Sequence, residues 1–237
     1  DALCDVLVAV SRMLADLPRL AELDINPLWV DAQGVVALDA RARFAREAVG
    51  GAGRFAILPY PSGCVGTRDW QGRTLVVRPI RPEDEAQHRR FLAASTPEDL
   101  RMRVFHTRGE LSHTELARLT QIDYDREMAF IAEDRDERGE GQTLGVARLG
   151  GDPDGVEAEF AVLVRSDLKG RGLGRLLLER LIDHARERGF KRLVGVVLRD
   201  NHRMLALVAD LGFVDDVAAA SEPGVRRVVL PLGIGPG

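Results

Sequence analysis

The sequence has little cysteine, no excess of one charge and no long hydrophobic run, and each shortage argues against a class of protein. Its two cysteines, Cys4 and Cys64, follow no metal-ligand or redox spacing, which argues against a disulfide framework and a cysteine metal site. No apolar run approaches the roughly 20 residues that span a bilayer, and the first residues lack a signal-peptide pattern. We therefore expect a cytoplasmic protein that does not contact membranes.

Charge and composition narrow the choice further. The 33 basic and 37 acidic residues leave a net charge of only −4, and the basic residues are scattered along the chain. This balance argues against a nucleic-acid-binding surface. With 45% hydrophobic and 30% charged residues, the 237 residues are typical of one globular domain, or of one domain with a remnant of another.

The first 72 residues differ from the rest in the spacing of their apolar residues and in their glycine and proline content. Apolar residues at helical spacing over 3–17 predict a helix that ends before Pro18, and two short apolar runs joined by DAQG then predict a hairpin. Residues 49–72 are rich in glycine and proline, and we interpret them as a linker. This divides the chain into an N-terminal segment 1–48, a linker 49–72 and a domain 73–232.

From Arg73 onward, strand and helix signals alternate regularly. Thr96 precedes Pro97 as a helix N-cap, and Ser112 with Glu115 forms a capping box. Three strand-like runs between 127 and 164 precede a helix over 174–188, which is followed by a strand, a helix and a last strand. The pattern predicts an α/β (α+β) fold with a mixed, mostly antiparallel sheet flanked by helices.

The stretch KGRGLG, which joins a strand to a helix, predicts an anion site. Gly170, Gly172 and Gly174 are spaced two and two, which fits neither a dinucleotide fingerprint nor a Walker loop. Backbone N–H groups at a helix N-terminus attract an anion, and glycines let it approach. Lys169 and Arg171 add positive charge, and Arg175 follows at the start of the helix.

This loop resembles the coenzyme-binding signature of the GNAT acetyltransferase superfamily, Gln/Arg-x-x-Gly-x-Gly/Ala. Lys169 stands at the first position, and Gly172 and Gly174 fill the glycine positions. The resemblance implies a GNAT fold in which loop amides hold the pyrophosphate of acetyl-CoA, the co-substrate, while its pantetheine arm follows the strand EFAVLV. The implied coenzyme-binding residues are Leu163, Val164, Lys169, Gly170, Arg171, Gly172, Leu173, Gly174, Arg175 and Asn201.

Acetylation of an amine requires a base, because a lysine ammonium has a pKa near 10.4. Glu157 and Glu159 share one face of the strand before the loop, since side chains alternate. Glu159 is about 6–7 Å nearer the coenzyme and partly desolvated among apolar neighbours. We therefore expect Glu159 to be the general base and Glu157 to be a solvated strand carboxylate.

The stretch RDNHRMLALVADLGF resembles a second family signature. Asn201 matches the asparagine that contacts pantetheine, whereas Val208 stands where a proton-donating tyrosine is usual. A thiol with a pKa near 8.5 leaves tolerably as the anion, so we expect the acid to be dispensable, with His202 as the one nearby titrating alternative. A backbone N–H near Leu163 or Val164 would meet the developing oxyanion, and no metal is required.

Polar residues also cluster in LTQIDYDREMAFIA, just before a strand. Two interpretations of Asp123, Tyr124, Asp125 and Arg126 stay open: they line the acceptor entrance, or they form a capped turn.

The first 48 residues carry a different resemblance. ELDINPL followed by ALDAR resembles the end of the ATP-grasp domain of NDP-forming acyl-CoA ligases, in which Asn26 and Asp39 match residues that help to hold magnesium. We interpret this segment as a ligase remnant that is unable to act alone.

A ligase end followed by an acetyltransferase resembles bacterial protein lysine acetyltransferases of the Pat type. That resemblance implies an acceptor lysine on an AMP-forming acyl-CoA synthetase, which acetylation inactivates. A GNAT enzyme acting on a small-molecule amine, and a non-catalytic acyl-CoA sensor, are the alternatives. The sequence does not indicate an oligomeric state.

Overall fold

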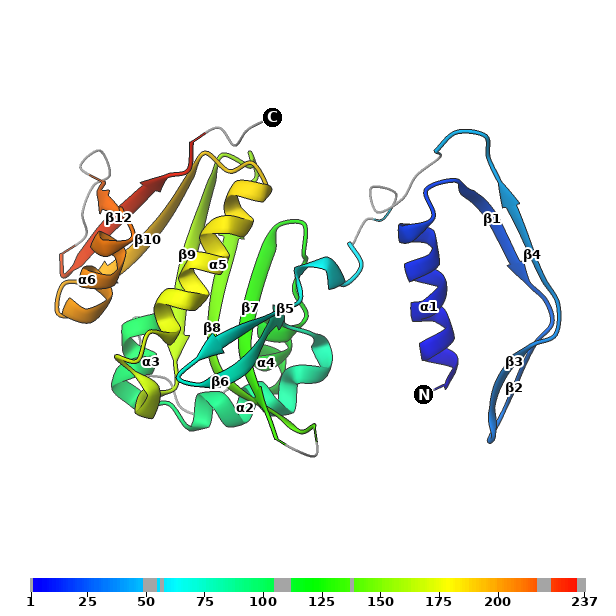
Figure 1. Ribbon diagram of the computed structural model, residues 1–237, viewed down its shortest axis with the longest axis horizontal. Coiled ribbons are helices and arrows are strands. Elements are labelled where there is room, and N and C mark those ends of the chain that lie inside the picture. Colours follow the sequence, from blue (N-terminus) through cyan, green and yellow to red (C-terminus); the bar gives the residue numbers. More distant parts are fainter. Residues whose placement is uncertain are drawn as a thin grey trace. The chain divides into compact units, whose positions relative to one another are not determined.

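The computed structural model describes residues 2–48, 55, 58–104, 112–136, 139–216 and 223–233. These residues belong to two compact units, Asp1–Tyr60 and Pro61–Gly237 (Figure 1). None of the helices in these ranges is long and apolar enough to cross a membrane.

The first unit is a helix followed by four short strands. Helix α1 (Ala2–Asp16) precedes β1 (Leu20–Ile25), β2 (Leu28–Asp31), β3 (Gly34–Ala37) and β4 (Ala40–Phe44). β1 pairs with β4 and β2 with β3, both antiparallel, so the predicted helix and hairpin are confirmed. The unit has little core, because Leu20 is the single buried side chain among its described residues.

The structure brings together the two residues of the ATP-grasp resemblance. The N–H of Asn26 donates to the backbone carbonyl of Asp39 at 3.1 Å. The Asp39 carboxylate lies 3.3 Å from Arg41 and is half exposed.

The second unit is built on an eight-stranded sheet in the order β11-β12-β10-β9-β8-β7-β6-β5 (Figure 1). Every neighbouring pair is antiparallel except β9 and β10, which are parallel. The predicted mixed, mostly antiparallel sheet is therefore confirmed. Its strands are β5 (Gly66–Trp70), β6 (Arg73–Pro79), β7 (Glu127–Arg135), β8 (Gly141–Gly151), β9 (Glu157–Val164), β10 (Arg192–Leu198), β11 (Val214–Asp215) and β12 (Val225–Pro231).

Helices cover both faces of this sheet (Figure 1). The first group is α2 (Glu85–Ala93), α3 (Pro97–Val104) and α4 (His113–Thr120), and the second is α5 (Leu173–Glu187) and α6 (His202–Asp210); short 3₁₀ turns lie at Ser62–Cys64, Pro82–Asp84 and Ser166–Leu168. Phe91 of α2 packs with Ile131 of β7, whereas Leu177 of α5 packs with the neighbouring Phe130. Because adjacent strand residues point to opposite faces, the two helix groups cover opposite faces.

Local signals placed the helix ends well. The Thr96 hydroxyl accepts the N–H of Asp99 at 3.3 Å, and Ser112 and Glu115 form the predicted capping box. The helix predicted over 174–188 runs over Leu173–Glu187, and Gly189 behind it has the positive φ of 81° that suits a helix end.

The predicted linker over 49–72 extends too far toward the C-terminus. Gly66–Trp70 form β5, the edge strand that pairs with β6, and Trp70 is buried in the main core. The second unit accordingly begins at Pro61 rather than at residue 73. A five-residue edge strand that contains glycine, threonine and aspartate lacks the alternation that marks longer strands.

Two buried histidines make the stability of the second unit depend on pH. His184 on α5 packs edge-on against Phe130, with ring centroids 5.5 Å apart. Burial, reinforced by the charges of Arg180 and Arg188, lowers the pKa of His184 to about 4. Burial also lowers the pKa of His88 to about 4, with help from Arg148 and against the opposing effect of Asp84.

The expected consequence is a loss of stability in mild acid. Between the unfolded pKa of about 6.5 and the folded value, the unfolded chain binds protons that the folded chain does not. The free energy of unfolding should therefore fall as pH falls, by up to about 1.4 kcal/mol per pH unit for each histidine. Urea unfolding at several pH values between 7 and 4.5 should show that the free energy of unfolding depends less steeply on pH in His184→Leu than in wild type. The same pH dependence in both proteins would contradict the lowered pKa of His184.

Candidate active site

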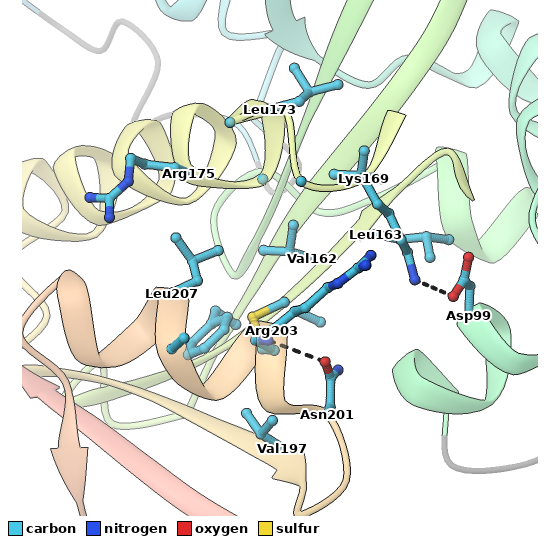
Figure 2. Close-up of a pocket in the computed structure, with 18 of the residues that line it drawn as sticks. Asp99, Val162, Leu163, Lys169, Leu173, Arg175, Val197, Asn201, Arg203 and Leu207 are labelled. Carbon is cyan, nitrogen blue, oxygen red and sulfur yellow. Dashed lines mark hydrogen bonds and ion pairs between the residues drawn. The ribbon is translucent and has the colours of Figure 1, made fainter. Parts of the chain in front are cut away.

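The sheet opens between its two parallel strands. β9 pairs with β10 only as far as the pair Glu159 and Val194, yet β9 continues to pair with β8 as far as Val164. A cleft of about 570 Å³ occupies this opening, and side chains from β9, β10, α5, α6 and the loop before α5 line it (Figure 2). Glu159 and Phe160 line one end of the cleft, and the glycine loop lines the other.

The hydrogen-bond register shows which backbone groups of β9 face the cleft. The N–H of Arg165 donates to the carbonyl of Leu144 at 2.9 Å, and the N–H of Asp152 donates to the carbonyl of Glu157 at 2.8 Å. Hydrogen-bonded pairs alternate along an antiparallel ladder, and both of these pairs involve odd-numbered residues of the β9 segment. Odd-numbered residues therefore direct their backbone groups toward β8.

The even-numbered residues Val162 and Val164 direct their N–H and C=O groups away from β8 and into the cleft. Of the two positions predicted to meet an oxyanion, Val164 fits this geometry, whereas the N–H of Leu163 points toward β8, although its side chain lines the cleft. Sequence reasoning missed Val162. The alternation of side chains along a strand does not show which residues direct their backbone N–H groups toward which neighbouring strand.

The glycine loop presents unpaired backbone donors. Gly170 and Gly172 have φ of +75° and +86°, in the left-handed region that glycine adopts most easily. Gly172 caps α5 without any side-chain acceptor, so the N–H groups of Leu173, Gly174 and Arg175 in the first turn have no cap from a side chain. A Cβ added at Gly170 or Gly172 would meet nothing within 4 Å, so the space over the loop is open. The loop fits an anion such as a pyrophosphate.

Lys169 contributes less positive charge to this loop than predicted. Its ammonium forms an ion pair with the carboxylate of Asp99 on α3 (Figure 2). The same carboxylate accepts a hydrogen bond from the hydroxyl of Ser166. Burial alone would raise the pKa of Asp99, but the hydrogen bonds from Lys169 and Ser166 outweigh it and hold the pKa below its usual range. The Lys169–Asp99 pair thus ties the loop to α3. Sequence reasoning missed Asp99, which looked like an ordinary first-turn acid.

Arg171 is exposed and does not line the cleft, and its role as a coenzyme contact stays a prediction. Its backbone carbonyl instead accepts a hydrogen bond from the indole N–H of Trp70 at 2.8 Å and a longer one from the side-chain amide of Gln71 at 3.5 Å. Trp70 lies in the segment predicted to be a linker, and it holds the loop from the far edge of the sheet.

The remaining predicted contacts line the cleft. Arg175 pairs with Asp210 of α6 at 2.9 Å, which links α5 to α6 across the cleft wall. Asn201 also lines the cleft, and its side-chain oxygen caps α6 by accepting the N–H of Met204 at 3.2 Å. Arg203 extends from α6 into the cleft and has no ion-pair partner among the described residues (Figure 2).

The two glutamates of β9 differ sharply. Glu157 is half-buried between Arg192 at 2.7 Å and Arg227 at 2.5 Å, so it is an ion-pair residue rather than the solvated carboxylate predicted. Glu159 lines the cleft and has no hydrogen-bond or ion-pair partner in the part of the chain that the structure describes. It is exposed, whereas the sequence predicted partial desolvation. An exposed carboxylate without a partner is accessible to an incoming amine.

Val208 and the polar cluster before β7 lie outside the cleft lining. Val208 is buried and offers no proton. The side chain of Asp123 accepts the N–H of Asp125, and the hydroxyl of Tyr124 donates to the carbonyl of Ile80 at 2.7 Å. Arg126 closes the same turn through its N–H to the carbonyl of Asp123. These contacts favour the capped-turn interpretation.

His202 begins α6 and is exposed. Within the described ranges, no three His, Cys, Asp or Glu side chains gather as metal ligands. A reaction without metal stays a prediction.

Two family models match the chain. The model of the acetyltransferase (GNAT) family matches residues 96–213, and that of an ATP-grasp domain matches residues 1–44. The chain is 34% identical over 143 residues to acetyltransferase PA5475 of Pseudomonas aeruginosa, an alignment that covers 60% of this chain and 76% of that protein.

Solved structures share the fold of the second unit. The GNAT domain of S. lividans PAT matches with a TM-score of 0.65 and 28% identity, over 73% of this chain and 99% of that one. The acetyltransferase yncA of Salmonella typhimurium, solved with its cofactor acetyl-CoA, matches with a TM-score of 0.53 and 21% identity, over 69% and 96% of the two chains.

The Asp99 ion pair leads to a stability prediction. Asp99→Asn removes the charge that partners Lys169, and hydrogen bonds to a charged group contribute about 1.5–3 kcal/mol each. Because the folded pKa of Asp99 is depressed, this stability is present above the unfolded pKa of about 3.9 and is lost as pH falls through the folded value. The difference from wild type in urea unfolding should be largest near pH 7 and narrow below about pH 4.

A matched control is Asp167→Asn, which removes an exposed carboxylate from the same loop. It should change stability much less, because exposed ion pairs are weak. Equal losses in the two variants would contradict a structural role specific to Asp99.

Proposed function

The chain belongs to the acetyltransferase (GNAT) family, and on that premise we propose that it acetylates the ε-amine of a lysine on another protein, using acetyl-CoA. The proposed acceptor is an AMP-forming acyl-CoA synthetase, which the modification inactivates. One observation carries the proposal: an exposed Glu159 without a partner among the described residues stands at one end of a cleft, and a glycine loop with no side-chain cap on its helix stands at the other.

The residues of the cleft suit coenzyme A. The pyrophosphate would rest on the N–H groups of Leu173, Gly174 and Arg175, at the start of α5. The pantetheine arm would then follow β9, where Val162 and Val164 supply backbone donors and acceptors without strand partners. From Val164 to Glu159 the strand advances about 16 Å, which separates the phosphate end from the reacting end. Asn201 and Arg203 close the α6 side of the cleft.

Acetyl-CoA supplies an acyl group activated as a thioester. Glu159 accepts a proton from the lysine amine, directly or through one water molecule, so that the nitrogen lone pair becomes available. A C–N bond forms, the nitrogen gives up its surplus proton to water, and the C–S bond breaks. The sulfur leaves as a thiolate that takes a proton from water. The N–H of Val162 or Val164 donates to the carbonyl oxygen as negative charge develops there.

A protein acceptor fits the exposure of the base. A small amine must be held by a pocket of its own, whereas a protein brings contacts from outside the site and needs only to present one side chain. Glu159 lines the cleft and is exposed to solvent, which suits the second case. The likeness to the GNAT domain of S. lividans PAT, and the ATP-grasp match over residues 1–44, support the same class of enzyme.

The test is acetylation of a purified AMP-forming acetyl-CoA synthetase, followed by intact mass. Wild type should add one acetyl group, and Glu159→Gln should be slower by about 10²–10⁴-fold with an unchanged Kd for acetyl-CoA. Glu157→Gln is the matched control, because it removes a carboxylate on the same face that is already paired with two arginines. It should retain most of the activity.

Each other outcome has a definite meaning. Acetylation of free amines but not of the synthetase would replace the acceptor with a small molecule. Coenzyme binding with no transfer to any amine would indicate a sensor. Equal rates in wild type and Glu159→Gln would show that another group is the base.

The indole of Trp70 leads to a second prediction. Trp70→Phe keeps a buried ring but loses the hydrogen bond to the carbonyl of Arg171. A hydrogen bond contributes about 1 kcal/mol, so we expect the affinity for CoA to fall roughly fivefold. Calorimetry should show a weaker Kd for CoA with little change in kcat. Gln71→Asn should have a smaller effect, because its contact with the same carbonyl is 3.5 Å long. An unchanged Kd in Trp70→Phe would show that the loop keeps its shape without this tie.

A further inference from the structure

One aromatic ring lies at the end of the cleft where β9 and β10 part. Phe160 follows Glu159, where pairing between β9 and β10 stops, and it is only 5% exposed while still lining the cleft. A Cβ added at Gly195 of β10 would lie 2.3 Å from Cε1 and 2.5 Å from Cζ of this ring. The ring therefore crosses from β9 to β10 and lies against the Gly195 backbone, in space that no other residue at 195 would leave free.

A second ring holds Phe160 from behind. Phe213 meets it edge-on, with ring centroids 5.1 Å apart and an angle of 60° between the planes. Both side chains are buried in the main core, but Phe213 does not line the cleft. Because closely packed interiors resist displacement of side chains, the Phe160 ring is a rigid wall.

The wall stands where an acyl group would end. If the pyrophosphate rests on the glycine loop, as the proposed function requires, the pantetheine arm runs along β9 from Val164 toward Glu159. The thioester then lies beside Val162, and the acyl chain beyond it points toward Phe160. Space for each added methylene is limited by the distance to that ring.

We propose that Phe160, seated on Gly195, limits the co-substrate to CoA thioesters of the shortest acyl groups. This inference rests on the proposed function and adds the acyl specificity. Acetyl fits in front of the ring, and straight chains of four or more carbons meet it. The bond changes of the reaction are the same for every acyl group, so Phe160 determines specificity through space alone.

Binding of a thioester series tests this without an acceptor. Calorimetry would give Kd for CoA, acetyl-CoA, butyryl-CoA and hexanoyl-CoA. Wild type should bind butyryl-CoA at least about tenfold more weakly than acetyl-CoA, the order of discrimination that one or two methylenes produce. In Phe160→Ala the ratio of the two Kd values should fall close to one, while the Kd for CoA itself changes little.

Two further variants separate specificity from loss of structure. Phe213→Leu disturbs the same core behind the wall, and it should keep the wild-type ratio. Phe160→Leu removes less volume and should give an intermediate ratio of the two Kd values. It replaces Phe160→Ala in the test if circular dichroism shows that Phe160→Ala is unfolded. A wild-type ratio in Phe160→Leu or Phe160→Ala, or equal binding of acetyl-CoA and butyryl-CoA by wild type, overturns the inference.

Failure of the proposed function looks different. If wild type does not bind CoA at all, the coenzyme assignment of the cleft is wrong, and the acyl inference is overturned with it. If CoA and acetyl-CoA bind normally and only the chain-length pattern differs from expectation, the acyl inference alone is overturned.

Discussion

β9 and β10 lie side by side as parallel strands but share hydrogen bonds only as far as Glu159 and Val194. Buried backbone N–H and C=O groups need hydrogen-bond partners. Where a strand loses its neighbour inside a fold, water or a ligand must supply those hydrogen bonds. The ring of Phe160 over Gly195 occupies the point where the strands part. The cleft and its free backbone donors, and the route from the glycine loop to Glu159, all follow from this separation.

The charged side chains around the glycine loop are mostly engaged with the protein itself. Lys169 pairs with Asp99, Arg175 pairs with Asp210, and the carbonyl of Arg171 is held by Trp70. These ties come from α3, α6 and β5, three elements far apart in the chain. Because the loop is fixed before any ligand arrives, its backbone amides are preorganised, and preorganised donors bind an anion without the cost of ordering a flexible segment. Among the described residues, Arg203 lines the cleft without an ion-pair partner, whereas Lys169 and Arg175 are both paired.

Local patterns were sufficient for the features that depend on neighbours in the chain. The capping box at Ser112 and the position of the glycine loop before α5 could both be predicted from short stretches, because turns and helix ends are set within a few residues. Three features could not be predicted. Asp99 reaches a lysine 70 residues away and Trp70 a carbonyl 101 residues away, and nothing local marks either contact. The choice between Leu163 and Val164 depends on strand register, which only the neighbouring β8 defines.

Amide hydrogen exchange, resolved residue by residue with and without acetyl-CoA, tests the central claim that the parted strands receive the coenzyme. The N–H groups of Val162 and Val164 should exchange quickly in the free protein and become protected when acetyl-CoA is added. The N–H of Leu163, which faces β8, should be protected in both states. If Val162 and Val164 are as protected as Leu163 without coenzyme, or are unaffected by it, the cleft between β9 and β10 is not the coenzyme site.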